Sequence, residues 1–373
     1  MTTIVHLSTV HPRFDIRIFV KQAQTTAASL PHKVILVVAD GKGDMKDQPG
    51  RVSIVDIGNA HGNFLRRVFL GFLWAFRAIR RIRPEVVHFH DPELIPLGIL
   101  LKVFGYIVIY DVHEDVPGQA LTKYWLPQRI RKFVAWLIYV TEGLGAMVFD
   151  AIVPATPKIA EHFPAQKSVI VQNYPIADEL LPRKRIPYCE RPPAFIYPGV
   201  IADIRGGVEM VQSIELLSHV PGVRLDLAGV FSPESFTAVL QALPGWQRVV
   251  YHGEVSREQL AHLLGNVRAG LVVHHPIPNE VDAQPIKMYE YMSVGLPIIA
   301  SDFPLWRQII SDAECGLLVN PLNPAEIAEA MRWILDNPEE AEAMGQRDRQ
   351  AVDTQYNWNV EVAKLIALDN KLL

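Results

Sequence analysis

The stretch HHPIPNEVDAQPIKMYEYMSVGLPIIASD, residues 274–302, predicts one repeating unit of a parallel β-sheet. Pro285 suits the first position of a helix and Gly295 suits the position after its end, so QPIKMYEYMSVG is expected to be helical. An apolar run precedes this helix, and the β-rich run PIIASDF follows it. A helix that connects two buried strands is typical of a doubly wound α/β fold.

The same alternation continues along all 373 residues. The first half contains TIVHL, KVILVVAD, RVSIVDIG, VVHFH, IVIYDVH, AIVPA and SVIVQNY, and the second half contains AFIYPGV, VRLDLAG, VVYHGEV, RAGLVVHHP, PIIASDF and CGLLVNP. We predict an N-terminal Rossmann-like domain at residues 1–182, a linker at 183–192 and a second Rossmann-like domain at 193–354. The last helix, within 355–373, is expected to return to the first domain. Ligands bind beyond the carboxyl ends of such strands, so the two sheets should share a cleft.

Composition restricts the class of protein. The chain is 49% hydrophobic and 20% charged, which fits an ordinary globular protein with two cores. Its start lacks the features of a signal peptide and no apolar run is long enough to span a bilayer, so we expect a cytoplasmic protein. Cys189 and Cys315 have no metal-ligand or redox spacing, which fits a reducing compartment.

The charge is divided unevenly along the chain. Residues 1–190 contain 23 Lys and Arg against 17 Asp and Glu, whereas residues 191–373 contain 13 against 23. A basic half favours an anionic partner. No zinc-finger, RNP or helix-turn-helix pattern is present, so a nucleic acid is not expected and an anionic lipid or a phosphate-bearing ligand suits better.

Two charged residues of the helix after Pro285 are candidates for binding a nucleotide. Lys287 lies in the first turn, where free N–H groups, the positive end of the helix dipole and an ammonium all favour a diphosphate. Glu290 lies three residues later on nearly the same face, and its carboxylate can accept hydrogen bonds from the hydroxyls of a ribose. The alternative is an exposed helical ion pair between Lys287 and Glu290.

The segment 274–302 resembles the signature of glycosyltransferase family 4. The members of that family are retaining, metal-independent enzymes with the GT-B fold. The signature of that family has two acidic residues separated by seven others and followed by a glycine-proline strand start. Here they are Asp282 and Glu290, followed by Gly295-Leu296-Pro297. The resemblance implies that Glu290 holds the ribose, that Asp282, where Glu is usual, contacts the transferred sugar, and that the amides at Pro285 and Ile286 face the donor.

Two further segments extend the resemblance. YPGVIADIRGGVEMV, residues 197–211, is similar to the glycine turn and basic residue that hold the diphosphate, which implies roles for Gly199 and Arg205. Val200 and Ile201 stand where the family often has an arginine. YHGEVSREQL, residues 251–260, resembles the segment whose backbone contacts the nucleobase, which places Gly253, Glu254 and Val255 near the base.

In the first half, polar residues follow two consecutive strands, where ligand-facing residues belong. One group contains His88, His90, Asp91 and Glu93, and the other contains Asp111, His113 and Glu114. By resemblance, His113 is the histidine that contacts the donor sugar or its phosphate. The alternatives are hydrogen-bonded structural residues, or a metal site formed by His90, Asp91, His113 and Glu114. We do not expect a metal, because no single element provides a chelating spacing.

The loop STVHPRFDIRIF, residues 8–19, follows the first strand and lacks the glycines that a nucleotide-binding fold usually has there. The resemblance makes Arg13 and Arg17 candidates for contacts with phosphate or acceptor. Salt bridges are the alternative for both arginines.

Two segments suit a membrane surface. FLRRVFLGFLWAFRAIRRIR, residues 64–83, places Arg66, Arg67, Arg77, Arg80 and Arg81 in one broad helical arc beside aromatic and aliphatic residues. QRIRKFVAWLIY, residues 128–139, has a weaker version of this pattern. Basic amphipathic helices of this kind bind anionic lipid, although the arginines could equally form the wet face of a helix that covers a sheet.

We therefore predict a retaining, metal-independent glycosyltransferase with a nucleotide diphosphate sugar as donor and no further cofactor. A glycan or lipid-linked acceptor would place it in the synthesis of cell-envelope polysaccharide, exopolysaccharide or lipopolysaccharide, in the cytoplasm and peripherally on the membrane. A non-catalytic subunit that binds sugar nucleotides is the main alternative, because of Asp282 and the missing arginine near Val200. A GT-B-shaped epimerase of nucleotide sugars is a weaker one.

Overall fold

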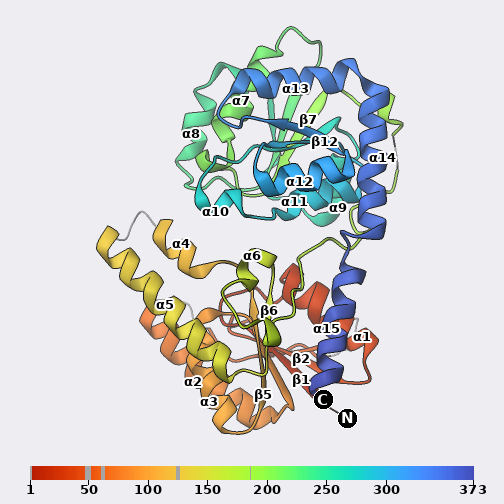
Figure 1. Cartoon of the computed structure of the whole chain (residues 1–373). Coiled ribbons are helices and arrows are strands. Elements are labelled where there is room, and N and C mark those ends of the chain that lie inside the picture. Colours follow the sequence, from red (N-terminus) through yellow and green to blue (C-terminus); the bar gives the residue numbers. More distant parts are fainter. Residues whose placement is uncertain (1, 47–51, 60–63, 123–126, 185) are drawn as a thin grey trace. The chain divides into compact units, whose positions relative to one another are not determined.

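The computed structural model describes residues 2–46, 52–59, 64–122, 127–184 and 186–373, except the side chains of residues 64–67, 122 and 128. The chain divides into two compact units (Figure 1). Unit 1 contains Met1–Asn173 and Trp358–Leu373, and unit 2 contains Tyr174–Asn357.

Unit 1 is built on a parallel six-stranded sheet with the order β3-β2-β1-β4-β5-β6. The strands are β1 (Thr3–Leu7), β2 (Lys33–Val38), β3 (Val52–Asp56), β4 (Val86–Phe89), β5 (Ile107–Val112) and β6 (Ala151–Pro154). The helices are η1 (Ile16–Ala23), α1 (Gln24–Ser29), α2 (Phe64–Ile82), η2 (Pro92–Leu94), α3 (Ile95–Val103), α4 (Val116–Thr122), α5 (Gln128–Val148), α6 (Pro157–Ala160), η3 (Ala165–Lys167) and α15 (Trp358–Leu372).

Unit 2 repeats this plan with the order β12-β11-β10-β7-β8-β9, again all parallel. Its strands are β7 (Ala194–Pro198), β8 (Arg224–Ala228), β9 (Val249–Tyr251), β10 (Ala269–Val272), β11 (Ile298–Ser301) and β12 (Gly316–Val319). Its helices are η4 (Tyr188–Glu190), η5 (Asp203–Arg205), α7 (Gly207–Leu216), α8 (Phe236–Gln241), η6 (Pro244–Arg248), α9 (Arg257–Leu264), α10 (Pro278–Val281), α11 (Ile286–Ser293), α12 (Pro304–Ala313), α13 (Pro324–Asp336) and α14 (Pro338–Thr354).

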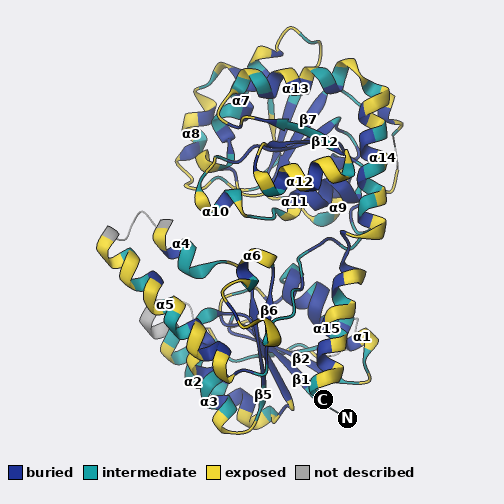
Figure 2. Cartoon of the chain, viewed as in Figure 1, coloured by how far each residue is buried: buried dark blue, intermediate teal, exposed yellow. Residues whose placement is uncertain are grey.

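The strands are nearly continuous apolar runs because helices cover both faces of each sheet. In β2, Ile35 and Val37 join the core beneath α2 and α3, whereas Val34 and Leu36 pack on the opposite face against η1 and α1. Most strands of both units are buried, the edge strand β9 being an exception, while the helices alternate between buried and exposed residues (Figure 2). Each sheet therefore separates two hydrophobic layers, as a doubly wound fold requires.

Three segments differ from what the sequence predicted. SVIVQNY, residues 168–174, is not a strand, although Val169 N and Val171 N donate to carbonyls of β6 at 2.9 and 3.1 Å. The expected linker at 183–192 packs on unit 2, because Tyr188 is buried and its hydroxyl donates to Arg268 O at 2.6 Å. The helix expected to begin at Pro285 begins one residue later, with Pro285 as its N-cap.

The last helix, α15, is part of unit 1. Its first residue, Trp358, is buried, and its indole N–H donates to Thr25 Oγ1 at 3.3 Å. The carboxylate of Glu361 accepts from the backbone N–H of Gln172 at 2.8 Å. These bonds connect α15 to segments more than 150 residues away in sequence.

No helix within the described ranges is long and apolar enough to cross a membrane.

Candidate functional site

The strand order of each sheet indicates where a ligand binds. In unit 1 the order reverses between β1 and β4, and in unit 2 it reverses between β10 and β7. Loops that leave neighbouring strands in opposite directions open a crevice at such a point, and ligands of doubly wound sheets bind there. Most of the predicted site residues follow these four strands or their immediate neighbours.

In unit 2, Lys287 lies beside Gly199 of the loop that follows β7. It lies in the first turn of α11, its side chain is 7% exposed, and its ammonium lies 3.6 Å from the centroid of the Tyr197 ring. Its Nζ has no hydrogen-bond acceptor among the described residues. Burial, and next the positive charge of Arg205, lower the pKa of Lys287 well below its usual value. An unpaired buried cation is costly, so the site is suited to an anion that would pair with it.

Glycines bring backbone close to this ammonium. Gly199 follows β7 with φ +108°, and a Cβ there would lie 3.5 Å from Lys287 Nζ. Gly206 has φ +74°, and a Cβ there would lie 2.1 Å from the carbonyl oxygen of Val273. Arg205, half-buried at the end of η5, immediately precedes that turn. The positive φ favours glycine at both positions, and the clash with Val273 excludes a side chain at Gly206. Glycine therefore allows the turn that carries Arg205 to lie directly against the end of β10.

The N-terminus of α11 is the second anion-favouring feature. Pro285 caps the helix with extended backbone, and no side chain bonds to the first amides. The side chain of Ile286 is exposed, so it leaves the amides open. Uncapped N–H groups and the positive end of the helix dipole stabilise negative charge. Together with Lys287 in the same turn, they form a site suited to a phosphate.

A histidine-carboxylate pair adjoins Lys287. His274 follows β10, and its Nδ1 lies 2.6 Å from Glu280 Oε2. Burial lowers the pKa of His274 to about 4, whereas the bond from His274 outweighs burial and lowers the pKa of Glu280. His274 is therefore neutral with its proton on Nδ1, and its buried Nε2 has no partner among the described residues. That nitrogen can accept a hydrogen bond from a ligand.

Asp282 lies outside this pair, although the sequence placed the sugar-contacting carboxylate there. It follows the single turn of α10 and is exposed, while Glu280, two residues earlier, is buried. Among the described residues Asp282 has no hydrogen bond or ion pair. The structure thus separates two carboxylates, one already bound by His274 and one free.

Glu290 is held by a residue that the sequence reasoning missed. Arg257, at the start of α9, donates to Glu290 Oε1 at 2.6 Å. It also donates to both carboxylate oxygens of Glu179, at 2.8 Å each. Burial opposes the charge of Arg257, but its bonds to Glu179 and Glu290 outweigh this effect and raise its pKa. The expected alternative, an exposed pair of Lys287 and Glu290, does not form, because both residues are buried.

The loop from β9 to α9 contains the residues predicted near a nucleobase. Gly253 has φ +66° and open space where a Cβ would lie, and its carbonyl accepts from Gly229 N at 2.7 Å. Glu254 is exposed and Val255 half-buried. Arg257 begins the next helix, so its bond to Glu290 fixes this loop against α11.

In unit 1, Asp91 joins the two loops of the crevice. Its carboxylate accepts from Ser8 Oγ at 3.1 Å and from the backbone N–H of Val10 at 3.2 Å, and it lies 2.9 Å from His11 Nδ1. These contacts, led by the bond with His11, outweigh burial and lower the pKa of Asp91. Asp91 is thus a structural anchor for the glycine-free loop after β1.

A chain of histidines crosses the end of this sheet. His6 Nδ1 lies 3.1 Å from His90 Nε2, and His90 Nδ1 lies 3.1 Å from His113 Nε2. His113 Nε2 is also 3.2 Å from Asp111 Oδ1. Because a carboxylate only accepts hydrogen bonds, His113 carries a proton on Nε2 and, when neutral, presents Nδ1 as an acceptor. Burial lowers the pKa of both His6 and His90 well below the usual value, so both are neutral.

The two arginines predicted to contact phosphate already have carboxylate partners. Arg13 bonds to both oxygens of Asp40, at 2.7 and 2.6 Å. Arg17 is buried and donates twice to Asp111 Oδ1, at 3.1 and 2.9 Å. The salt-bridge alternative therefore describes both residues as the structure has them.

The remaining candidates of unit 1 include a set of possible metal ligands. His88, His90 and Asp111 offer ligand atoms within 4.8 Å of one another. However, Arg17 and Gln22 donate to Asp111, and His90 is bonded through both nitrogens. His90 would have to give up one of its two hydrogen bonds to bind a metal, so the arrangement fits a hydrogen-bonded network better. Glu114 is exposed and accepts from Gln119, away from this network.

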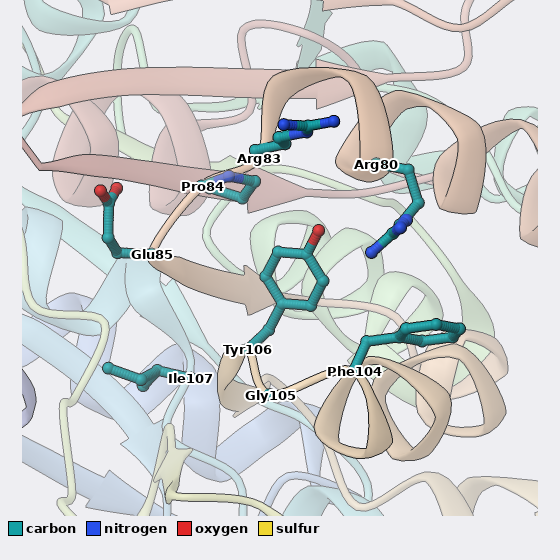
Figure 3. Close-up of a pocket in the computed structure, with 8 residues that line it drawn as sticks. All are labelled: Arg80, Arg83, Pro84, Glu85, Phe104, Gly105, Tyr106 and Ile107. Carbon is teal, nitrogen blue, oxygen red and sulfur yellow. The ribbon is translucent and has the colours of Figure 1, made fainter.

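A surface pocket lies at the opposite edge of the unit 1 sheet, near the amino ends of β4 and β5 (Figure 3). It is lined by Arg80, Arg83, Pro84, Glu85, Phe104, Gly105, Tyr106 and Ile107. Because ligands of doubly wound sheets bind at the carboxyl edge, this pocket is not the candidate site.

Sequence reasoning missed His274, Glu280, Arg257 and Tyr197. A signal existed for His274, since it follows a predicted strand in HHP, as His90 and His113 follow theirs. Arg257 and Tyr197 gave no signal, because their partners Glu290 and Lys287 are 33 and 90 residues away in the chain.

Residues 183–351 match the family model described as Glycosyl transferases group 1. The MMP alpha-(1->4)-mannosyltransferase of Mycolicibacterium hassiacum is 25% identical over 312 residues, which cover 81% of this chain and 74% of that protein.

Two solved structures share the fold along the full length. The sucrose-phosphate synthase of Thermosynechococcus elongatus has a TM-score of 0.78 at 16% identity and covers 100% of this chain and 99% of its own. HepE of Anabaena, in complex with UDP-glucose, has a TM-score of 0.74 at 10% identity and covers 100% of both chains. The chain therefore has the GT-B fold, and its residues 183–351 are similar to the glycosyl transferases group 1.

Proposed function

We propose that this protein is a retaining, metal-independent glycosyltransferase that moves a sugar from a nucleotide diphosphate donor to a glycan or lipid-linked acceptor. The observation that carries the proposal is the buried ammonium of Lys287, without an acceptor among the described residues, in the first turn of α11. A donor diphosphate supplies the charge that this position lacks. The family match of residues 183–351 and the complex of HepE with UDP-glucose support the same donor class.

The donor is proposed to bind at the crevice of unit 2. Lys287, Arg205 and the amides after Pro285 hold the diphosphate, and Gly199 lets it approach the backbone. Glu290, oriented by Arg257, accepts hydrogen bonds from the ribose hydroxyls, and the backbone of Gly253, Glu254 and Val255 meets the base. A bonded carboxylate keeps free lone pairs, so Glu290 can serve both Arg257 and a ribose.

The remaining polar groups are proposed to act on the transferred sugar. Asp282 is the free carboxylate of its loop and binds sugar hydroxyls, while Nδ1 of His113 accepts a hydrogen bond from a sugar hydroxyl. The acceptor hydroxyl attacks on the face from which the diphosphate departs, and the departing phosphate takes its proton. Lys287 and Arg205 then stabilise the negative charge that grows on that phosphate.

The acceptor is proposed to belong to cell-envelope polysaccharide, exopolysaccharide or lipopolysaccharide. Support comes from the excess of basic residues in the first half of the chain, which favours an anionic surface or acceptor. His90, Asp91 and Glu114 remain candidates for the acceptor side, with Asp91 acting through the loop that it anchors.

The test is a thermal-shift screen with nucleoside diphosphates and their sugars, followed by NMR of the slow hydrolysis of each donor that binds. We expect the first sugar anomer released to match the donor, with turnover unchanged by EDTA. Loss of turnover with EDTA and its return with Mg²⁺ or Mn²⁺ would overturn metal independence. Binding without hydrolysis or transfer would indicate a non-catalytic subunit, and conversion of the nucleotide sugar itself would indicate an epimerase.

A further inference from the structure

Helix α5 carries its large apolar side chains outward. Phe133, Trp136 and Met147 are 60%, 57% and 64% exposed, and spacings of three and eleven residues, close to one and three helical turns, place them on one face. The exposed hydrophobic residues of this helix are Ile130, Phe133, Trp136, Leu137, Tyr139, Leu144, Met147 and Val148. We call them the outer face of α5, which is largely exposed in Figure 2. From Ile130 to Val148 they extend about 27 Å along the helix axis.

The inner face of α5 is composed of small and polar residues. Ala135 and Ala146 are buried, and the buried carboxylate of Glu142 accepts from Tyr110 Oη at 3.0 Å. A Cβ at Gly145 would lie 2.6 Å from the ring of Phe149, so the helix approaches that ring as closely as it can. These contacts fix the rotation of α5. The apolar face therefore remains outward in the folded unit.

The exposed charges on α5 itself have one sign. Arg129 and Lys132 are exposed near its N-terminus, and Lys167 donates to the carbonyls of Met147 and Phe149 at 2.7 Å each at its C-terminus. The only acidic residue in the helix is Glu142, which is buried. A partner for this face must therefore offer apolar groups flanked by negative charge.

We propose that the outer face of α5 lies in the interface of an anionic lipid bilayer, with its apolar side chains among the acyl chains and Arg129 and Lys132 at the headgroup phosphates. Tryptophan and tyrosine, here Trp136 and Tyr139, are enriched at that depth. A second copy of this chain fits less well, because two α5 faces would bring the exposed cations of both helices together.

This assignment moves the membrane contact away from the arginine-rich segment at 64–83. In α2, Ala75 and Ile79 are buried and Arg77 and Arg81 are exposed, as in an ordinary helix that covers a sheet. The side chains of Arg66 and Arg67 lie outside the described residues. The inference deepens the acceptor side of the proposed function. Vesicle binding requires neither donor nor sugar transfer, so a failure of membrane binding can be distinguished from a failure of the proposed transferase activity.

The test is flotation of the full chain with vesicles of phosphatidylcholine and phosphatidylglycerol in equal parts. Trp136→Asp should lower the partition coefficient at least about tenfold, because a carboxylate must enter an apolar layer. Phe69→Asp, the matched change at a 68% exposed residue of α2, should change it less than about twofold. Replacing Arg129 or Lys132 by Gln should each lower the partition coefficient about fivefold. The same change at Arg77 or Arg81 should lower it far less.

Two further measurements identify the occupant. Brominated acyl chains should quench the fluorescence of Trp136, isolated as the difference between wild type and Trp136→Phe. Equal vesicle binding by wild type and Trp136→Asp, or a loss seen with Phe69→Asp alone, would overturn the proposal. A wild-type dimer without lipid that Trp136→Asp converts to a monomer would assign the face to a second copy and also overturn it. Unchanged melting of each variant shows that folding is intact.

Discussion

Lys287→Met should separate donor binding from folding. The substitution removes a cation that is buried without an acceptor among the described residues, and methionine keeps a similar length and apolar stem. Loss of the contact with the Tyr197 ring costs up to about 2 kcal/mol, which the relieved burial of the charge offsets. We therefore expect the unligated variant to melt no lower than wild type.

The ligand response should change far more. At one hundred times its dissociation constant, a nucleoside diphosphate stabilises wild type by about 2.7 kcal/mol. For a unit of this size, that corresponds to a shift of about 5–10 °C. Removing a charge-assisted bond worth about 1.5–3 kcal/mol weakens binding about 10- to 100-fold, so the same concentration should stabilise the variant by only about 0.4–1.4 kcal/mol.

A proton accompanies this binding. Burial and the charge of Arg205 lower the pKa of Lys287, and an arriving diphosphate should raise that pKa again. Wild type should therefore take up at most about one proton per ligand bound at alkaline pH. Titration calorimetry in buffers of different ionisation enthalpy measures this uptake, which Lys287→Met should abolish. The matched control is Arg248→Met, at the amino end of β9, which should behave as wild type. Equal ligand stabilisation of Lys287→Met and wild type would refute the reasoning.

Three further outcomes are expected. Glu290→Gln should weaken nucleoside diphosphate binding by about 1.5–3 kcal/mol in calorimetry, and unchanged affinity would remove this residue from the site. Arg205→Ala should lower kcat more than it raises KM, because its charge meets a phosphate that becomes more negative as the sugar leaves; a rise in KM alone would contradict this. Burial raises the pKa of Glu142 to about 7, so the native state retains an extra proton between about pH 4.5 and 7 and loses stability as pH rises through that window. Glu142→Gln should therefore match wild type in urea at pH 5 and exceed it by a few kcal/mol at pH 8, and equal stability at both pH values would argue against the shift.

The fold could be predicted from sequence where local patterns decide it. Runs such as KVILVVAD and PIIASDF are too apolar for any place but a covered strand, and the helices between them require a parallel sheet. The strand predicted at SVIVQNY was wrong, because this segment has strand composition but lies beyond the last strand of the sheet. Within it, only Ser168 forms a bridge with β6. The segment 183–192 looked like a linker because its charges and prolines hid the burial of Tyr188, which depends on the distant Arg268.

The candidate site was predictable only in part. A helix N-terminus with lysine in its first turn is a local feature, and the structure places Lys287 there. Which carboxylate is buried is not local: Glu280 and Asp282 differ by two positions, and the single turn of α10 together with His274 decides between them. The pairing of Arg17 with Asp111 also joins η1 to β5, which are 94 residues apart in the chain.

The opposite charges of the two halves suggested that phosphate would bind in the basic half, but the local pairing of charges argues otherwise. In unit 1, Arg13 and Arg17 are matched by Asp40 and Asp111, so an added anion would meet no uncompensated charge from either. In unit 2, which has the acidic excess, the ammonium of Lys287 is buried without an acceptor among the described residues. Salt screens the effect of exposed acids on charges more than about 8 Å away at physiological ionic strength, whereas it screens a buried cation much less. We therefore expect anion binding in unit 2 to follow the unpaired ammonium of Lys287 rather than the sum of charges over the sequence.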